Sequence, residues 1–448
     1  MINLLVIATL VCSFSVDYLA RKLGLISPYF ILLPELFSGI ALLVVFARIL
    51  AGKRLLLDAR YILFLVLLFF TIAMGAVAQA VPSGAIISGL RDYLRFLPFF
   101  LLPAIYPFTG RQIKAQLTVL GVMLIVQVPV AVYQRFFAFA DRMHTGDVVT
   151  GTMSTSGSLS ILMVAGVAGL TVLYLKRRLS LALLLAATGF LLLPTMLNET
   201  KATLVMLPIA MLAPLFLMRG AERPFRRLFP LVAVFAATGV VFIGVYNTLM
   251  QEHRDSEASL QEFWFEGGVQ NYVYKGSVEG DSRVGRLDSL QLAVRGVTQT
   301  PLRAAFGLGV GNVSPAQIPG FEGEYAHYYD LYKISFTQAS MLLWNMGFMG
   351  LVVFGLFYFA TFRDALLLAR SSGPSAMLGQ VWAPITLIAA MCLAYKSTVT
   401  MNEIMYPLMF YAGVLARTAY SLRREQRARR HEAARPGVWR PVSAMARQ

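Results

Sequence analysis

The residues of this 448-residue chain that could do chemistry are cations placed against long apolar segments. Lys201 follows the short turn Asn198–Thr200 between two apolar runs, and Arg286 opens the amphipathic stretch RLDSLQLAVRGV. A charge at the start of an apolar helix is costly unless it is paired or functional. An arginine fork matches phosphate oxygens in a bidentate way, and a lysine adds a point charge. These residues therefore suit the binding of a phosphate-like anion, with a Glu199–Lys201 ion pair as the alternative interpretation.

Soluble-enzyme motifs are missing from the sequence. It has no Walker loop, no HExxH, no GxSxG and no dinucleotide fingerprint, because GLGVGN at 307–312 lacks the required strand and helix around it. We interpret Gly307, Gly309 and Gly311 as turn formers. The four histidines, at 144, 253, 327 and 431, show no metal-ligand spacing. We therefore expect neither a catalytic metal nor a cofactor.

The composition indicates a membrane protein. Hydrophobic residues make up 57% of the chain and charged residues 14%, whereas soluble domains are about 25% charged. The apolar residues come in runs close to the roughly 20 residues that a helix needs to cross a bilayer. The sequence thus predicts an all-α polytopic membrane protein with about 12 transmembrane helices. These are expected near 3–20, 29–51, 60–80, 86–106, 114–136, 155–175, 179–197, 200–218, 228–248, 338–362, 377–395 and 398–417.

The positions of lysine and arginine in short loops predict the orientation. Basic loops near 53–60, 176–178 and 219–227 fall on the same side as the tail, so both termini are expected in the cytoplasm. The tail after 417 is rich in arginine and accounts for much of the net charge of +16, which we attribute to topology and lipid contact rather than to nucleic acid. The expected divisions are a membrane domain at 1–248, a partly helical outer loop at 249–337, a second membrane domain at 338–417 and a basic tail at 418–448.

Several further cations fall at the expected outer ends of the spans, where the same bias should deplete them. Contact with lipid headgroups explains any one of them, but the whole set suits an anionic ligand. These cations are Arg91, Arg95, Arg135, Arg142, Arg283 and Arg295.

Four stretches in order resemble the superfamily of O-antigen ligases and Wzy-type O-antigen polymerases. They are VQVPVAVYQRF (126–136) followed by GDVVTGTMSTSGSLS (146–160), the hairpin LLLPTMLNETKATLVMLPIAML (191–212), RLDSLQLAVRGVTQTPLRAAFGLGVGN (286–312) and QASMLLWNMGFMGLVVFG (338–355). The likeness covers about 120–355. It implies a GT-C-like fold in the bacterial inner membrane, with the large loop in the periplasm.

The resemblance also implies a substrate and its ligands. Members of this superfamily take a glycan from undecaprenyl diphosphate and pass it to an acceptor glycan or glycolipid. Lys201 matches the basic hairpin residue and Arg286 matches the large-loop arginine, so both are expected to bind the diphosphate. Arg142, Arg283 and Arg95 are further candidates. A chain-length regulator is an expected protein partner.

One position departs from the ligase pattern. Ligases carry a histidine about eleven residues before a glycine ahead of the last spans, and that register gives Phe336 before Gly347 here. The candidates for the catalytic base are therefore His327, Asp330 and Glu324.

The sequence favours a periplasmic-facing polymerase of undecaprenyl-diphosphate-linked repeat units. An O-antigen ligase is the alternative, because it would share the fold and the donor. A lipid-linked oligosaccharide transporter is the alternative from another class, but it should have polar residues deep in the spans and two related halves.

Overall fold

The structure is a computed structural model that describes residues 1–139, 146–217, 224–251, 285–314, 316, 320–326 and 337–433. Within these residues it contains fifteen α-helices and no strand. The helices are α1 (Ile2–Asp17), α2 (Leu33–Leu50), α3 (Ala59–Ala78), α4 (Ser83–Leu94), α5 (Leu97–Ile105), α6 (Gly110–Tyr133), α7 (Ser156–Leu175), α8 (Leu181–Leu197), α9 (Ala202–Leu217), α10 (Pro224–Gln251), α13 (Arg286–Val297), α14 (Pro301–Phe306), α16 (Gln338–Ala369), α17 (Pro374–Tyr395) and α18 (Asn402–Ala433).

Eight helices in the described residues are long and apolar enough to cross a membrane, and α8 and α9 are apolar but shorter. The prediction of an all-α, multi-pass membrane protein is therefore confirmed. Each of the twelve predicted stretches falls on a helix or, for the fourth, on the consecutive pair α4 and α5. The break between this pair lies at Arg95–Phe96, just before Pro98, which has no N–H to continue the helix.

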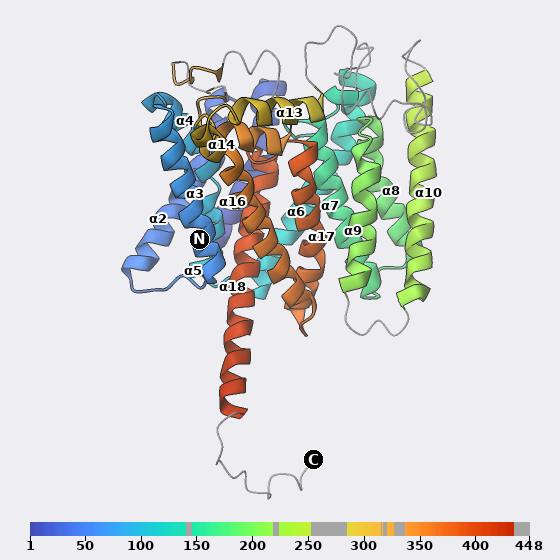
Figure 1. Cartoon of the computed structure of the whole chain (residues 1–448). Helices are drawn as coiled ribbons and strands as arrows, with labels where there is room; N and C mark the ends of the chain where they lie inside the picture. The colour runs from blue at the N-terminus through green and yellow to red at the C-terminus, as the bar shows by residue number, and fades with distance from the viewer. Residues whose placement is uncertain are drawn as a thin grey trace, which may run out of the picture.

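The two ends of the bundle differ. At one end α13 and α14 lie across the ends of the other helices, and at the opposite end the last turns of α18 project beyond the bundle (Figure 1). We call these the cap end and the tail end. The turn between α8 and α9 lies at the cap end, whereas Lys53 and the basic residues 176–178 lie at the tail end. The amphipathic stretch in the large loop does form a helix, α13, as predicted.

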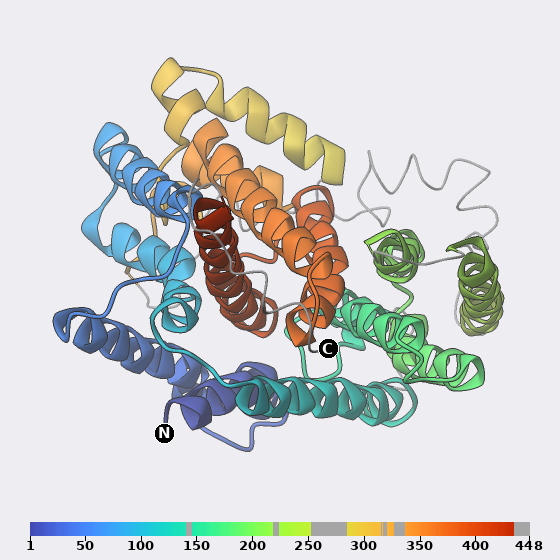
Figure 2. The same ribbon diagram turned by 90° about the horizontal axis from the view of Figure 1, so that it is seen from below.

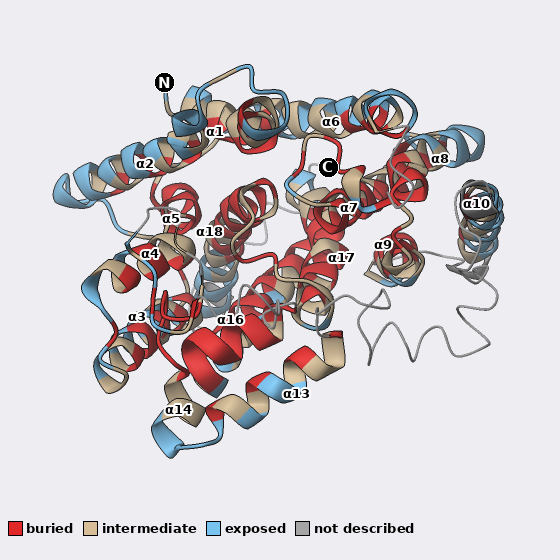
Figure 3. Cartoon of the chain, turned by 90° about the horizontal axis from the view of Figure 1, so that it is seen from above, coloured by how far each residue is buried: buried red, intermediate tan, exposed pale blue. Residues whose placement is uncertain are grey.

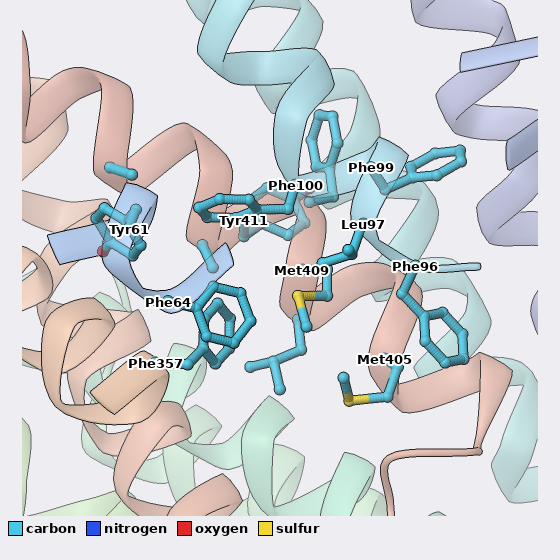
Figure 4. Packing of buried hydrophobic residues seen from close by; sticks show 14 of the residues in the cluster. Tyr61, Phe64, Phe96, Leu97, Phe99, Phe100, Phe357, Met405, Met409 and Tyr411 are labelled. Atoms are coloured by element: carbon cyan, nitrogen blue, oxygen red, sulfur yellow. The ribbon is translucent and has the colours of Figure 1, made fainter. Parts of the chain in front are cut away.

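The core lies where α5, α16 and α18 meet α3. Seen from the tail end, α16 and α18 occupy the centre of the bundle (Figure 2). Buried residues concentrate on these helices and on α7 and α17, while α2 and α10 expose apolar side chains at the rim (Figure 3). Close aromatic contacts fill the centre, including Phe64 with Phe357 at 5.0 Å and Tyr61 with Phe100 at 5.3 Å between ring centroids (Figure 4).

A buried ion network joins three helices near the tail end. Asp364 of α16 is fully buried, and Arg423 of α18 donates to its Oδ1 at 2.8 Å. Tyr61 donates its hydroxyl to Oδ2 at 2.9 Å, and Arg60 also pairs with Oδ1. A buried carboxylate needs such partners, so the network fixes α3, α16 and α18 relative to one another.

The glycine loop 307–312 attaches the cap to the membrane helices. Its three glycines have φ values of +71°, +89° and +80°, which confirms them as turn formers. Each glycine also lies against another glycine, so two backbones approach closely. The pairs are Gly307 with Gly347 of α16, Gly309 with Gly75 of α3 and Gly311 with Gly89 of α4.

The same loop compensates a kink in α16. Gly347 has a non-helical φ of +63°, so the helix is broken there. The carbonyl of Trp344, one turn earlier, accepts the N–H of Leu308 at 2.7 Å. The loop therefore supplies a hydrogen bond in place of one that the kinked helix lacks.

We predict that Gly311→Ala destabilises the protein by more than about 1 kcal/mol, because the new Cβ would lie 1.8 Å from the carbonyl oxygen of Ala85. Gly52→Ala is the control, because Gly52 has a similar φ of +75° but open space around it. Thermal unfolding followed by size-exclusion chromatography in detergent compares the two. Equal melting temperatures would contradict the role of the close approach.

Candidate functional site

Lys201 stands at the cap end in the tight turn between α8 and α9. The side-chain amide of Asn198 is buried and donates to the carbonyl of Ser156 at 3.1 Å, and its oxygen accepts the N–H of Thr200 at 3.1 Å. These bonds tie the turn to the first turn of α7. The Lys201 ammonium lies 5.6 Å from the ring centroid of Tyr246 in α10, a cation–π contact. The predicted hairpin thus places this cation among α7, α9 and α10.

Glu199 forms an ion pair with Arg135. Its Oε1 lies 3.2 Å from Nη1 of Arg135, and both side chains are largely buried. Glu199 also adopts a left-handed φ of +59°, which the tight turn imposes. Arg135, one of the cations singled out at the outer span ends, therefore holds the end of α6 against the α8–α9 turn.

Arg286 is the first residue of α13 and lies against the end of α17. Its Nε donates to the carbonyl of Tyr395 at 3.2 Å, and its guanidinium lies 5.2 Å from the centroid of the Tyr395 ring. Small residues let α13 approach α16, since Ser289 and Ser340 share a hydrogen bond of 2.8 Å. Arg286 is thus positioned by α13, α16 and α17 together.

The segment 396–401 between α17 and α18 is a feature that the sequence analysis missed. The predicted spans leave only two residues here, whereas α18 begins at Asn402. Thr398 is buried and donates to Oε1 of Gln338 in α16 at 2.6 Å, while the carbonyl of Thr400 accepts from Arg95. At the start of α18, Glu403 is buried and accepts the N–H of Ser154 at 3.1 Å. The segment therefore contacts α16, the α4–α5 break and the approach to α7.

Lys396 opens this segment and lies across the first turn of α7. A Cβ added to Gly157 would stand 2.7 Å from Cδ of Lys396 and 3.3 Å from its Nζ. The neighbouring Ser156 donates its hydroxyl to Asp147 at 3.1 Å. The first turn of α7 thus contacts Lys396, which follows the Arg286-bound Tyr395, on one side and the hairpin that carries Lys201 on the other. We call Arg135, Asp147, Glu199, Lys201, Arg286 and Lys396 the cap cluster.

Arg95, a predicted diphosphate ligand, lies in a separate ion cluster. Arg91 binds both oxygens of Glu35, with 2.6 Å from Nε to Oε2, and Arg95 donates to Oε1 at 2.8 Å. Only 8% of the Arg95 side chain is exposed, and it donates as well to the carbonyl of Thr400. In this structure Arg95 therefore connects α2, the α4–α5 break and the segment 396–401.

Glu324 is the one candidate base among the described residues. It is exposed, in a loop that packs on the glycine loop, where its N–H donates to Oδ1 of Asn312 at 3.0 Å. That loop lies over α4, which contacts Gly311 through Gly89. The helices α16 and α18 lie between α4 and α9, so Glu324 is not beside the Lys201 hairpin (Figure 3). Arg142, Arg283, His327 and Asp330 lie outside the described residues.

The fold defines a multi-pass membrane protein, and its cap cluster lies at the cap end of the helices. No three metal-binding side chains come together in the described part of the chain. No protein-family model matches the sequence, and no curated protein matches it.

We predict that Glu35→Gln destabilises the protein by roughly 3 kcal/mol, because two largely buried arginines lose their shared carboxylate. Asp17→Asn removes the partner of Arg21 in a more exposed ion pair, at 3.3 Å, and should leave the melting temperature almost unchanged. Thermal unfolding of both purified variants in the same detergent makes the comparison. A Glu35→Gln protein as stable as the parent would show that the cluster does not hold α2 and α4 together.

Proposed function

We propose that the chain is an inner-membrane glycosyltransferase that polymerises undecaprenyl-diphosphate-linked oligosaccharide units at the periplasmic face. The observation that carries this proposal is the cap cluster. Lys201 and Arg286, which match the two basic positions of the resembled superfamily, are 85 residues apart in sequence yet both lie at the cap end around the first turn of α7. Cations on separate helices suit a ligand with several charged oxygens.

The distribution of charge supports the orientation. Lys53, Arg54 and the basic residues 176–178 lie at the tail end, together with the arginine-rich end of α18. Positive loops stay in the cytoplasm, so the tail end faces the cytoplasm and the cap end faces the periplasm. Lipid-linked glycans for polymerisation are presented on that outer side in the resembled superfamily.

The proposed reaction is a displacement at the anomeric carbon of the lipid-linked sugar. An acceptor hydroxyl oxygen forms the new bond, and the bond from the anomeric carbon to the diphosphate oxygen breaks. The electron pair goes to the diphosphate, where Lys201 and Arg286 neutralise the developing charge. The hydroxyl proton passes to a base, for which His327 and Asp330 are the candidates, because Glu324 lies over α4 and away from the Lys201 hairpin. The donor supplies the energy, so no nucleotide is consumed.

A ligase that transfers the finished glycan to another glycolipid is the second candidate. It would use the same donor and the same cations, and only the acceptor would differ. Phe336 stands at the position where ligases carry a histidine, and this difference favours the polymerase.

We predict that Lys201→Gln and Arg286→Gln each abolish long-chain polysaccharide in cells, because the leaving group loses a positive charge in the transition state. Removing one such electrostatic contact costs about 100- to 1000-fold in rate. Arg178→Gln is the control, since Arg178 is exposed at the tail end. Polysaccharide gels and immunoblots of protein level give the readout. Full-length polymer in both cap-end variants would refute the diphosphate clamp.

Deletion of the gene distinguishes polymerase from ligase. We predict that a deletion strain attaches single repeat units to the final acceptor, because transfer continues while elongation stops. Gel analysis of the acceptor glycolipid and mass spectrometry of the lipid-linked pool give the readout. An acceptor without glycan, together with accumulated lipid-linked polymer, would instead identify the ligase.

A further inference from the structure

Lys396 is a cation that neither the spans nor the resemblance singled out. It follows α17 directly, and its N–H closes that helix on the carbonyl of Cys392 at 3.1 Å. Its side chain then crosses the first turn of α7 at Gly157. A side chain there would collide with the Lys396 Cδ and press on its Nζ, so glycine leaves the room that the ammonium occupies.

Arg286 contacts the residue that precedes this lysine. Its Nε binds the carbonyl of Tyr395, the residue immediately before Lys396, and its guanidinium packs on the Tyr395 ring. The end of α17 therefore contacts Arg286 through Tyr395 and is followed directly by Lys396.

Both cations also lie at helix starts. Arg286 is the first residue of α13, and the Lys396 ammonium lies over the first turn of α7. The partial positive charge of a helix start favours an anion, while the C-terminal end of α17 favours the two cations that lie against it. Asp147 reaches the same turn of α7 through Ser156, and Asp288 lies in the first turn of α13. The arrangement concentrates positive charge from two side chains and two helices, which suits a multiply charged anion.

We propose that Lys396 is a further phosphate-binding residue of the cap cluster, and that with Arg286 it binds the diphosphate of a polyprenyl-diphosphate donor. This inference rests on the proposed function for the identity of the donor. The positions of Lys396, Gly157 and Tyr395 carry the assignment itself. The α7–α17 contact thus forms one wall of the diphosphate site, and the α8–α9 hairpin with Lys201 forms another.

The test measures binding of farnesyl diphosphate, a short polyprenyl diphosphate, to the purified full-length chain in detergent. Lys396→Met keeps the length of the side chain and removes its charge. We expect it to weaken binding about tenfold, as the loss of one charged hydrogen bond does. Gly157→Val keeps the charge but displaces the ammonium, and we expect weaker binding there as well. Lys176→Met, at the opposite end of α7 and exposed, should bind like the parent.

Farnesol, which lacks the phosphates, separates charge recognition from lipid binding. Its affinity should be the same in the parent and in Lys396→Met. An unchanged affinity of Lys396→Met for farnesyl diphosphate, or an equal loss for farnesol, would overturn the assignment of Lys396. Weakened diphosphate binding by Lys396→Met, together with full-length polymer in cells from which the gene is deleted, would instead leave the assignment standing and refute the polymerase function.

Discussion

At the cap end, three departures of the described backbone from helical geometry find their hydrogen bonds inside the protein. In a bilayer an unsatisfied N–H or C=O costs several kcal/mol, so irregular backbone persists only where the protein itself pairs it. The kink at Gly347 is paired by Leu308, and the segment after α17 is held through Thr398 and Gln338. The α8–α9 turn is held by Asn198. The positions of the cap-end cations follow from these constraints.

The charged residues at the cap end fall into two groups according to the residues that they contact. Glu35 binds both Arg91 and Arg95, so that cluster fixes α2 against the α4–α5 break. Arg286 and Lys396 meet at the end of α17, where Arg286 donates to the carbonyl of Tyr395 and Lys396 reaches the first turn of α7. The first arrangement fixes helices to one another through a shared carboxylate, and the second brings cations from two helices together, which suits an anionic ligand. The Asp364 network near the tail end belongs to the first kind, because its carboxylate is fully buried among its partners.

Sequence patterns predicted those features that depend on local periodicity or on a single residue type. The apolar runs gave the positions of the helices, the turn at Asn198–Thr200 gave the tight hairpin, and the glycines at 307–311 gave the turns of the cap loop. All of these are set by the length of a run or by backbone freedom, which a local window contains.

Partners distant in sequence could not be predicted in this way. Glu35 is 60 residues from its partner Arg95. Glu199 forms an ion pair with the distant Arg135, whereas the sequence suggested a pair with its neighbour Lys201. The segment 396–401 looked like the first turn of an apolar span, because Thr398 and Val399 are compatible with one. Its non-helical path depends on Gln338 and Arg95, which no pattern within the segment encodes.

Reconstitution of the purified chain into liposomes with a defined undecaprenyl-diphosphate oligosaccharide, and without any nucleotide, tests the central claim most directly. The account predicts longer lipid-linked glycans and the release of one undecaprenyl diphosphate for each bond formed. A protein that is folded and correctly inserted but leaves the donor intact, with no diphosphate released, would contradict it.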